Sequence, residues 1–280
     1  MSGKRKRSSD ITLLVGAGRM GGALLKGWLA QGRGPLAVIE PTPNPEIRRF
    51  ARRNAICLLT SVEDARDLQV STCLIALKPQ ILKGEAVRFK PIANSGALMI
   101  SIAAGTSIGA LRKAWGRQSM IIRAMPNTPG AIGHGITALY APPRISAALR
   151  NRAETLVVGL GETFWVNRER LIDGVTAVSG SGPAYVFLFA ECLAHAAREQ
   201  GFSPEISLKL ARATISGAGA LLEADDREPA ALRRDVTSPG GTTEAALGVL
   251  RADDALEALL SKAVKAARLR ATELRCQSEL

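Results

Sequence analysis

The chain has 280 residues, of which 46% are hydrophobic and 4% aromatic. This excludes a disordered chain and suits one large domain or two ordinary ones. The formal net charge of +12 suggests nucleic-acid binding. However, the basic residues beyond residues 1–10 are scattered, and aromatic residues that would stack on bases make up only 4% of the chain. We therefore expect a disordered basic leader over residues 1–10 and no nucleic-acid partner.

The cysteines and the apolar stretches indicate where the chain resides. The four cysteines are far apart without metal-ligand spacing, so we expect no metal site, and reduced, buried thiols at Cys73 and Cys192. No apolar stretch approaches the roughly 20 residues that cross a bilayer, and the leader lacks the apolar core of a secretory signal. These features favour a cytoplasmic protein without a membrane partner.

Apolar runs alternate with helical segments over the first 168 residues. The alternation implies parallel strands joined by crossovers, which is an α/β fold. Ligands of such sheets bind at the carboxyl ends of the strands. Strands are expected at 11–15, 36–39, 72–77, 98–102 and 121–124, with later candidates at 136–140 and 162–166, and helices at 22–31 and 46–53.

After about residue 168 the pattern is helical only. Helices are expected at 183–200, from Ser203-Pro204-Glu205 onward, and at 254–274. The last helix carries an Ala-rich apolar stripe. The stripe fits an ordinary core and a close helix contact across subunits equally well.

Residues 16–21 match the pattern G-x-G-x-x-G between an expected strand and an expected helix. In this context Gly16 permits a tight turn, Gly18 lets the backbone approach a pyrophosphate, and Gly21 allows close packing of helix and strand. The N–H groups at the helix N-terminus attract the anion. The motif predicts a dinucleotide cofactor.

Glu40 ends the second expected strand, about 20 residues after the glycines, where an acid usually bonds the ribose hydroxyls of the cofactor. A carboxylate there repels a 2′-phosphate, which favours NADH over NADPH. Thr42, Arg48 and Arg49 offset this by offering groups that bind a phosphate. Both NADH and NADPH therefore stay open.

Two further segments, 179–185 and 238–244, are expected to be loops of small residues running into helices. Such loops present backbone N–H groups to an anion, for example a substrate carboxylate. Helix capping is the alternative, but it does not need Gly-Gly followed by Thr-Thr. The two histidines, His134 and His195, give little support for a Ser-His-Asp arrangement. Hydride transfer to a C=N bond needs neither histidine, because the cofactor carries that chemistry.

Six segments resemble pyrroline-5-carboxylate reductases, and they occur in the order found in that family. They are residues 16–23, 76–79, 101–105, 123–129, 178–187 and 235–247, the last being the family signature. The resemblance implies NAD(P)H-dependent reduction of the C=N bond of L-1-pyrroline-5-carboxylate to L-proline, the last step of proline biosynthesis. It implies a Rossmann domain over 11–168 and an all-helical substrate and dimerisation domain over 169–280. It also implies a homodimer, and in the family dimers often assemble further into decamers.

The resemblance also implies the roles of individual residues. Thr243 is the expected catalytic residue, with its hydroxyl reaching the ring nitrogen of the substrate. Asp235 stands where many members have Asn, and Glu40 where a small or hydroxyl residue is common. The implied cofactor-binding residues are Val15, Gly16, Ala17, Gly18, Arg19, Met20, Glu40, Ala76, Leu77, Lys78, Pro79, Ile102, Ala103 and Ala104. The implied substrate-binding residues are Glu169, Asp235, Ser238, Gly241, Thr242 and Thr243.

Three other functions stay open on the sequence. The chain fits another imine or β-hydroxyacid reductase, a nucleic-acid-binding protein that uses the basic leader, or an NAD-binding regulator without catalysis. The segment 238–243 argues against a hydroxyacid dehydrogenase, which needs an explicit acid such as a central helical lysine.

Overall fold

The computed structural model describes residues 10–277. The expected leader, apart from Asp10, lies outside the described residues. The chain forms two compact units: unit 1 runs up to Gly180 and resumes at Ala267, and unit 2 comprises Ser181–Ala266. The chain therefore passes between the units twice, whereas the sequence placed a single boundary after residue 168.

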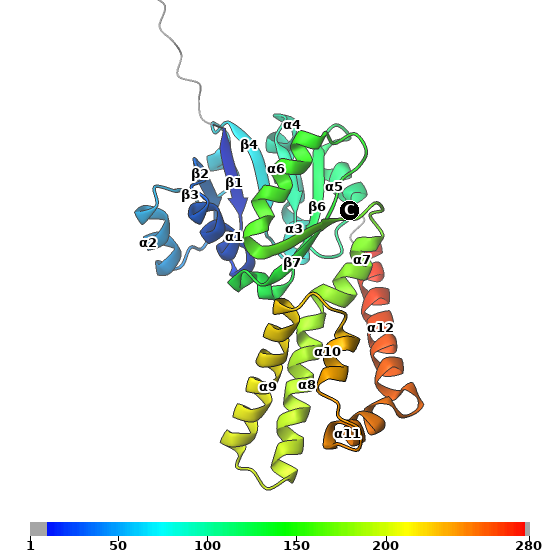
Figure 1. Ribbon diagram of the computed structural model, residues 1–280. Coiled ribbons are helices and arrows are strands. Elements are labelled where there is room, and N and C mark those ends of the chain that lie inside the picture. Colours follow the sequence, from blue (N-terminus) through cyan, green and yellow to red (C-terminus); the bar gives the residue numbers. More distant parts are fainter. Residues whose placement is uncertain (1–9, 278–280) are drawn as a thin grey trace, which may run out of the picture. The chain divides into compact units, whose positions relative to one another are not determined.

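Unit 1 is built on an eight-stranded sheet (Figure 1). Its strands are β1 (Ile11–Val15), β2 (Leu36–Ile39), β3 (Cys57–Leu59), β4 (Val70–Ile75), β5 (Leu98–Ser101), β6 (Met120–Met125), β7 (Gly135–Tyr140) and β8 (Gly161–Trp165). Their order in the sheet is β3-β2-β1-β4-β5-β6-β7-β8. All neighbours pair in parallel except β6 and β7, which are antiparallel. The connection between these two holds only a 3₁₀ turn, Thr128–Ile132, and is too short for the crossover that parallel strands require.

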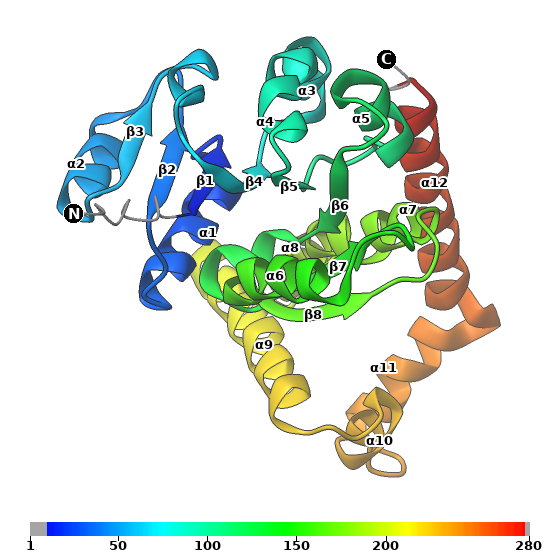
Figure 2. The same ribbon diagram turned by 90° about the horizontal axis from the view of Figure 1, so that it is seen from above.

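Helices cover both faces of this sheet (Figure 2). The helices α1 (Arg19–Ala30), α2 (Pro45–Arg53) and α6 (Ala147–Val157) contribute to the core on one face. The helices α3 (Pro79–Glu85), α4 (Lys90–Asn94) and α5 (Ile108–Trp115) contribute to the core on the other. The N-terminal half thus has the α/β architecture that the alternating pattern predicts.

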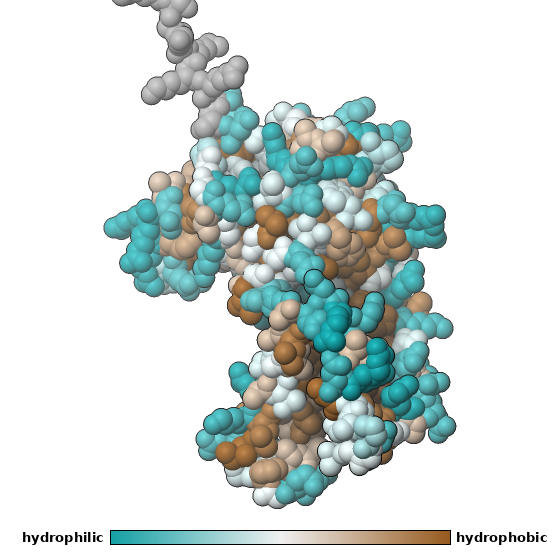
Figure 3. Space-filling view, in the orientation of Figure 1, coloured by the Kyte–Doolittle hydropathy of each residue, from teal (hydrophilic) through white to brown (hydrophobic). Residues whose placement is uncertain are grey.

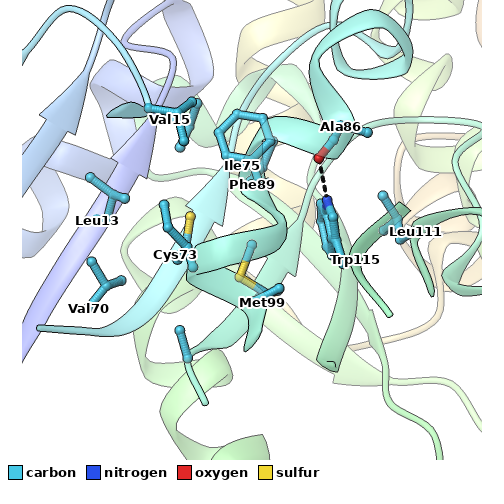
Figure 4. Close-up of a cluster of buried hydrophobic side chains, with 14 of the residues drawn as sticks. Leu13, Val15, Val70, Cys73, Ile75, Ala86, Phe89, Met99, Leu111 and Trp115 are labelled. Carbon is cyan, nitrogen blue, oxygen red and sulfur yellow. Dashed lines mark hydrogen bonds between the residues drawn. The ribbon is translucent and has the colours of Figure 1, made fainter. Parts of the chain in front are cut away.

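The second of these cores is shown in Figure 4. Trp115 is completely buried, and its indole N–H donates to the carbonyl oxygen of Ala86 at 2.8 Å, so its one polar group is satisfied. Cys73 lies in the same core, and burial raises the pKa of its thiol. Its expected state, a buried free thiol, is confirmed.

The C-terminal half is helical, as predicted. A short helix, α7 (Leu171–Val175), continues into a π-helical turn at Thr176–Gly180. The segment 179–185 is therefore not the loop that we expected, because this turn carries the helix toward the next one. The remaining helices are α8 (Gly182–Glu199), α9 (Pro204–Ala224), α10 (Pro229–Asp235), α11 (Thr242–Arg251) and α12 (Ala255–Gln277).

Small side chains allow α8 and α9 to pack together within unit 2. Ala194 of α8 and Ser207 and Ala211 of α9 are the buried residues of these two helices. Ser203 caps α9 as predicted, since its hydroxyl accepts from the N–H of Ile206 at 3.4 Å. Cys192 on α8 is exposed, so the expectation of a buried thiol there is wrong.

Large apolar side chains are exposed along the helices of unit 2, and Figure 3 shows this apolar surface in brown. They include Val186, Phe187, Leu188 and Phe189 on α8, Leu208, Leu221 and Leu222 on α9, Val249 on α11 and Leu259 on α12. Among residues 10–277, one helical stretch, Leu171–Glu199, is long and apolar enough to cross a membrane by length and composition alone. The sequence analysis predicts no such stretch.

Candidate active site

The glycine turn after β1 has the geometry that its motif predicts. Gly16 has a φ of +88°, and a Cβ added there would lie 2.9 Å from the carbonyl oxygen of Ala76. Both its backbone conformation and this close approach therefore require glycine. The turn lets α1 begin at Arg19, directly after residues 16–18. The predicted helix began at residue 22, three residues later.

The N-terminus of α1 is open to a ligand. A Cβ added at Gly18 would meet nothing within 4 Å, so protein packing does not explain glycine at this position. Gly18 is the N-cap residue and makes no side-chain cap, and within residues 10–277 the N–H groups of Arg19 and Met20 have no hydrogen-bond acceptor. Free donors at an unobstructed helix N-terminus fit a pyrophosphate.

The Glu40 side chain is fixed beside this turn. Its Oε2 accepts a hydrogen bond from the N–H of Ala17 at 2.8 Å, and the residue is half-buried. One carboxylate oxygen is thus occupied by the turn itself, and the negative charge is held at the end of β2 next to the glycines.

Two other predicted segments lie at the same edge of the sheet. Residues 76–79 follow β4 and residues 102–104 follow β5, and both strands are parallel to β1. The N–H of Ala76 donates to the carbonyl oxygen of Val15 at 2.8 Å, and the N–H of Ile102 donates to the carbonyl oxygen of Ile75 at 3.1 Å. The structure therefore brings together the predicted cofactor-binding segments, although the Val15 side chain lies in the core and leaves only its backbone for a ligand. The edge fits a dinucleotide.

A second helix N-terminus, that of α11, carries the predicted substrate residues. The N–H of Gly241 donates to the carbonyl oxygen of Ser238 at 3.0 Å, and the N–H of Gly240 donates to Glu244 Oε2 at 2.7 Å. Within the described part of the chain, the N–H groups of Thr242 and Thr243 have no acceptor. The donors that remain available for an anion here are therefore the N–H groups of Thr242 and Thr243.

The other predicted residues near α11 have different surroundings. Thr243 is half-buried, whereas Thr242 and Ser238 are exposed. Asp235 ends α10, and its Oδ2 pairs with the Arg227 guanidinium at 2.9 Å. The aspartate that stands here in place of the common Asn is therefore paired with a cation of the same unit.

Glu169 belongs to unit 1, whereas the other predicted substrate residues belong to unit 2. Its Oε1 accepts from the N–H of Ile108, the first residue of α5, at 2.7 Å and from Arg123 at 3.0 Å. Arg123 is 2% exposed; burial lowers the pKa of its guanidinium, and the Glu169 carboxylate opposes that shift. The sequence reading missed Arg123, although a cation inside the apolar run of β6 was the available signal.

The glycine turn, the open helix N-termini and the parallel sheet edge define a pyridine-nucleotide-dependent oxidoreductase with a separate helical unit. Residues 169–274 match the model of the pyrroline-5-carboxylate reductase dimerisation family, and residues 10–105 match that of the coenzyme F420-dependent NADP oxidoreductases. The chain belongs to the pyrroline-5-carboxylate reductase family, because reductases of that family are more than 30% identical to it over nine tenths of its length or more.

Individual relatives support this membership along the whole chain. The chain is 38% identical to the pyrroline-5-carboxylate reductase of Pseudomonas aeruginosa over 269 residues, covering 95% of this chain and 97% of that one. It is 34% identical to the enzyme of Haemophilus influenzae over 261 residues, covering 90% and 96%. The structure of the Coxiella burnetii reductase is similar with a TM-score of 0.85 and 33% identity, covering 96% and 99%. The Plasmodium falciparum reductase, solved with NADP bound, has a TM-score of 0.79 and 27% identity, covering 96% and 100%.

Proposed function

We propose that the N-terminus of α1 holds the dinucleotide and that the N-terminus of α11 holds the substrate carboxylate. The chain is an NAD(P)H-dependent oxidoreductase that reduces the C=N bond of L-1-pyrroline-5-carboxylate to L-proline. The observation that carries the proposed site is the N-terminus of α1, which follows Gly16 and Gly18. Its first N–H groups have no acceptor among the described residues, and no side chain obstructs Gly18.

The cofactor residues would act mainly through their backbone. Arg19 and Met20 donate N–H groups to the pyrophosphate, and Gly18 leaves room for it. The segments 76–79 and 102–104 line the remainder of the nucleotide. When bound, the cofactor supplies the hydride, so the protein itself need only bind, orient and protonate.

The substrate residues would hold the ring and its proton. The N–H groups of Thr242 and Thr243 bind the carboxylate, and the Thr243 hydroxyl holds the proton at the ring nitrogen. Gly241 contributes the backbone conformation, because its own N–H is bound to Ser238. Ser238 and Glu169 remain proposed substrate-site residues by their match to the family, and Asp235 by its position, at which many members have Asn.

NADH is the proposed preferred cofactor. The Ala17 N–H fixes the Glu40 carboxylate where the adenosine ribose is expected, so its charge meets a 2′-phosphate. Arg48, which offers a compensating cation, already donates through its Nε to the carbonyl oxygen of Pro43 at 3.0 Å. NADPH is therefore accepted less well.

The protein self-associates through its dimerisation domain, and we propose a homodimer that is able to form larger assemblies such as a decamer. A second copy, rather than a membrane, would cover the exposed apolar side chains of unit 2. We keep the division into a Rossmann domain over 11–168 and a helical domain over 169–280. The free thiols of Cys57, Cys192 and Cys276 are exposed, which suits the reducing cytoplasm. We assign no nucleic-acid partner.

The experiment is the steady-state oxidation of NADH and of NADPH, separately, with L-1-pyrroline-5-carboxylate. We expect proline as the product and a higher kcat/KM with NADH. No turnover with either cofactor would overturn the proposed reaction. Equal values, or a preference for NADPH, would remove Glu40 from the choice of cofactor.

A further inference from the structure

Two ion pairs, Arg123–Glu169 and Arg275–Asp173, lie within unit 1. Arg123 of β6 pairs with Glu169, as described above. Asp173 of α7 is 2% exposed, and its Oδ2 accepts from Arg275 Nε at 2.9 Å and from the Thr272 hydroxyl at 3.4 Å. The two carboxylates and two guanidiniums balance in charge, which buried ion pairs require. Arg275 and Thr272 lie on the last turns of α12.

These last turns of α12 contact further parts of unit 1 near the proposed cofactor edge. A Cβ added at Gly105, which has a φ of +68°, would lie 3.0 Å from the Cβ of Leu274. The Nζ of Lys83 on α3 donates to the carbonyl oxygen of Gln277 at 2.9 Å. Figure 2 shows this end of α12 beside α5.

The contacts converge on the loop 102–107, between β5 and α5. Glu169 accepts from the N–H of Ile108 at the end of the loop, Leu274 packs against Gly105 in its middle, and Ser107 caps α5 with its hydroxyl, which accepts from Ala110 at 3.0 Å. A loop held at several points loses little conformational entropy when a ligand binds to it.

We propose that the end of α12, through the Asp173–Arg275 pair and Leu274, is a positioning element that holds the loop 102–107 in its cofactor-binding conformation. The proposal rests on the proposed function, which places the dinucleotide along residues 102–104. In this proposal Asp173, Arg275 and Leu274 act through the loop and not by contact with the cofactor or the substrate. Their loss weakens cofactor binding because the loop must then be ordered at the moment of binding.

The test measures NADH affinity by the quenching of protein fluorescence, together with kcat and both KM values, for Arg275→Leu and Leu274→Ala in the full-length protein. We expect the Kd and KM for NADH to rise about fivefold, with kcat and the KM for L-1-pyrroline-5-carboxylate changed less than twofold. Arg275→Lys keeps the charge and is expected to restore most of the affinity.

Arg275→Leu leaves the buried Asp173 carboxylate without its cationic partner, and this change is expected to destabilise the fold. The double variant Asp173→Leu/Arg275→Leu removes both charges and keeps the test valid, since it is expected to fold and still to show the raised Kd. The matched control is Arg88→Leu, which breaks the exposed ion pairs with Glu63 and Glu85. We expect unchanged NADH affinity in the control.

The outcomes separate this proposal from the proposed site. Ala104→Glu places a charge on the loop itself and is expected to abolish NADH binding. If Ala104→Glu binds NADH like the wild type, the proposed cofactor site is wrong. If Ala104→Glu loses binding but the Arg275, Leu274 and double variants keep wild-type affinity, the site stands and the positioning role is overturned. A fall in kcat with equally large rises in both KM values would also overturn the positioning role, because it would indicate a general structural defect.

Discussion

Glu40 is the residue whose charge bears most directly on the choice of cofactor. Replacing it by serine removes the carboxylate that is fixed by the Ala17 N–H. We expect Glu40→Ser to shift the ratio of kcat/KM values toward NADPH by on the order of tenfold, because a nearby negative charge no longer opposes the 2′-phosphate. Glu40→Gln is the control for geometry: it keeps an acceptor for Ala17 and should show a similar shift. No shift in either variant would leave Glu40 a structural residue of the turn.

Thr243 is expected to act on the substrate rather than on the cofactor. Thr243→Val removes the hydroxyl and keeps the backbone N–H, so we expect kcat to fall about a hundredfold with little change in the Kd for NADH. Stopped-flow turnover and a fluorescence titration measure the two quantities. Thr243→Ser should keep most of the turnover, and Thr242→Val, at the exposed neighbour, should have a smaller effect. Unchanged turnover in Thr243→Val would remove the hydroxyl from the mechanism.

The residues that could be predicted from the sequence are those whose roles depend on near neighbours in the chain. Gly16 and Gly18 were predicted by a local motif, because their roles depend on neighbours within the same turn. The Asp173–Arg275 contact joins residues 102 positions apart in the chain. No local pattern identifies that pair, since its partners meet only after both crossings between the units are made.

At the scale of elements, the helix α2 depends on its N-cap. The Asn44 side chain accepts from the N–H of Ile47 at 2.9 Å. We expect Asn44→Ala to lower the free energy of unfolding by about 1 kcal/mol, because a donor of the first turn loses its acceptor. Urea denaturation at a fixed protein concentration, followed by circular dichroism, gives the value. Asn44→Asp keeps the acceptor and should unfold like the wild type; an equal loss in both variants would contradict the capping role.

The sequence predicted long elements better than short ones. The buried strands β1 and β2 were predicted with the bounds they have, and the long helices α8 and α12 with ends displaced by a few residues. The short helices α3 and α4 were not predicted, because five to seven residues give too little periodicity to distinguish a helix from a loop. The antiparallel pairing of β6 with β7 was missed for a related reason, since it depends on the length of one connection.

At the scale of the whole molecule, unit 2 exposes large apolar side chains along several helices, a feature typical of surfaces that bind another protein. Phe187 of α8 is 63% exposed. We expect Phe187→Asp to convert the proposed dimer into monomers, because a buried, unpaired carboxylate at the proposed interface costs several kcal/mol. Light scattering coupled to gel filtration measures the mass. Val87→Asp, at a residue 66% exposed in unit 1, is the matched control and should keep the wild-type mass. A dimer in both variants would place the subunit contact elsewhere.

The return of the chain to unit 1 at Ala267 has a consequence for biosynthesis. A ribosome completes the sheet and α7 long before it makes Arg275, so Asp173 emerges well ahead of its cation. The nascent Rossmann-type layer is therefore incomplete throughout synthesis of the helical unit, and its contacts with α12 form only after residues 267–277 have been made. Folding of unit 1 therefore waits for the whole helical unit, and synthesis that stops within that unit leaves the Asp173 carboxylate without the cation that it pairs with in the folded protein.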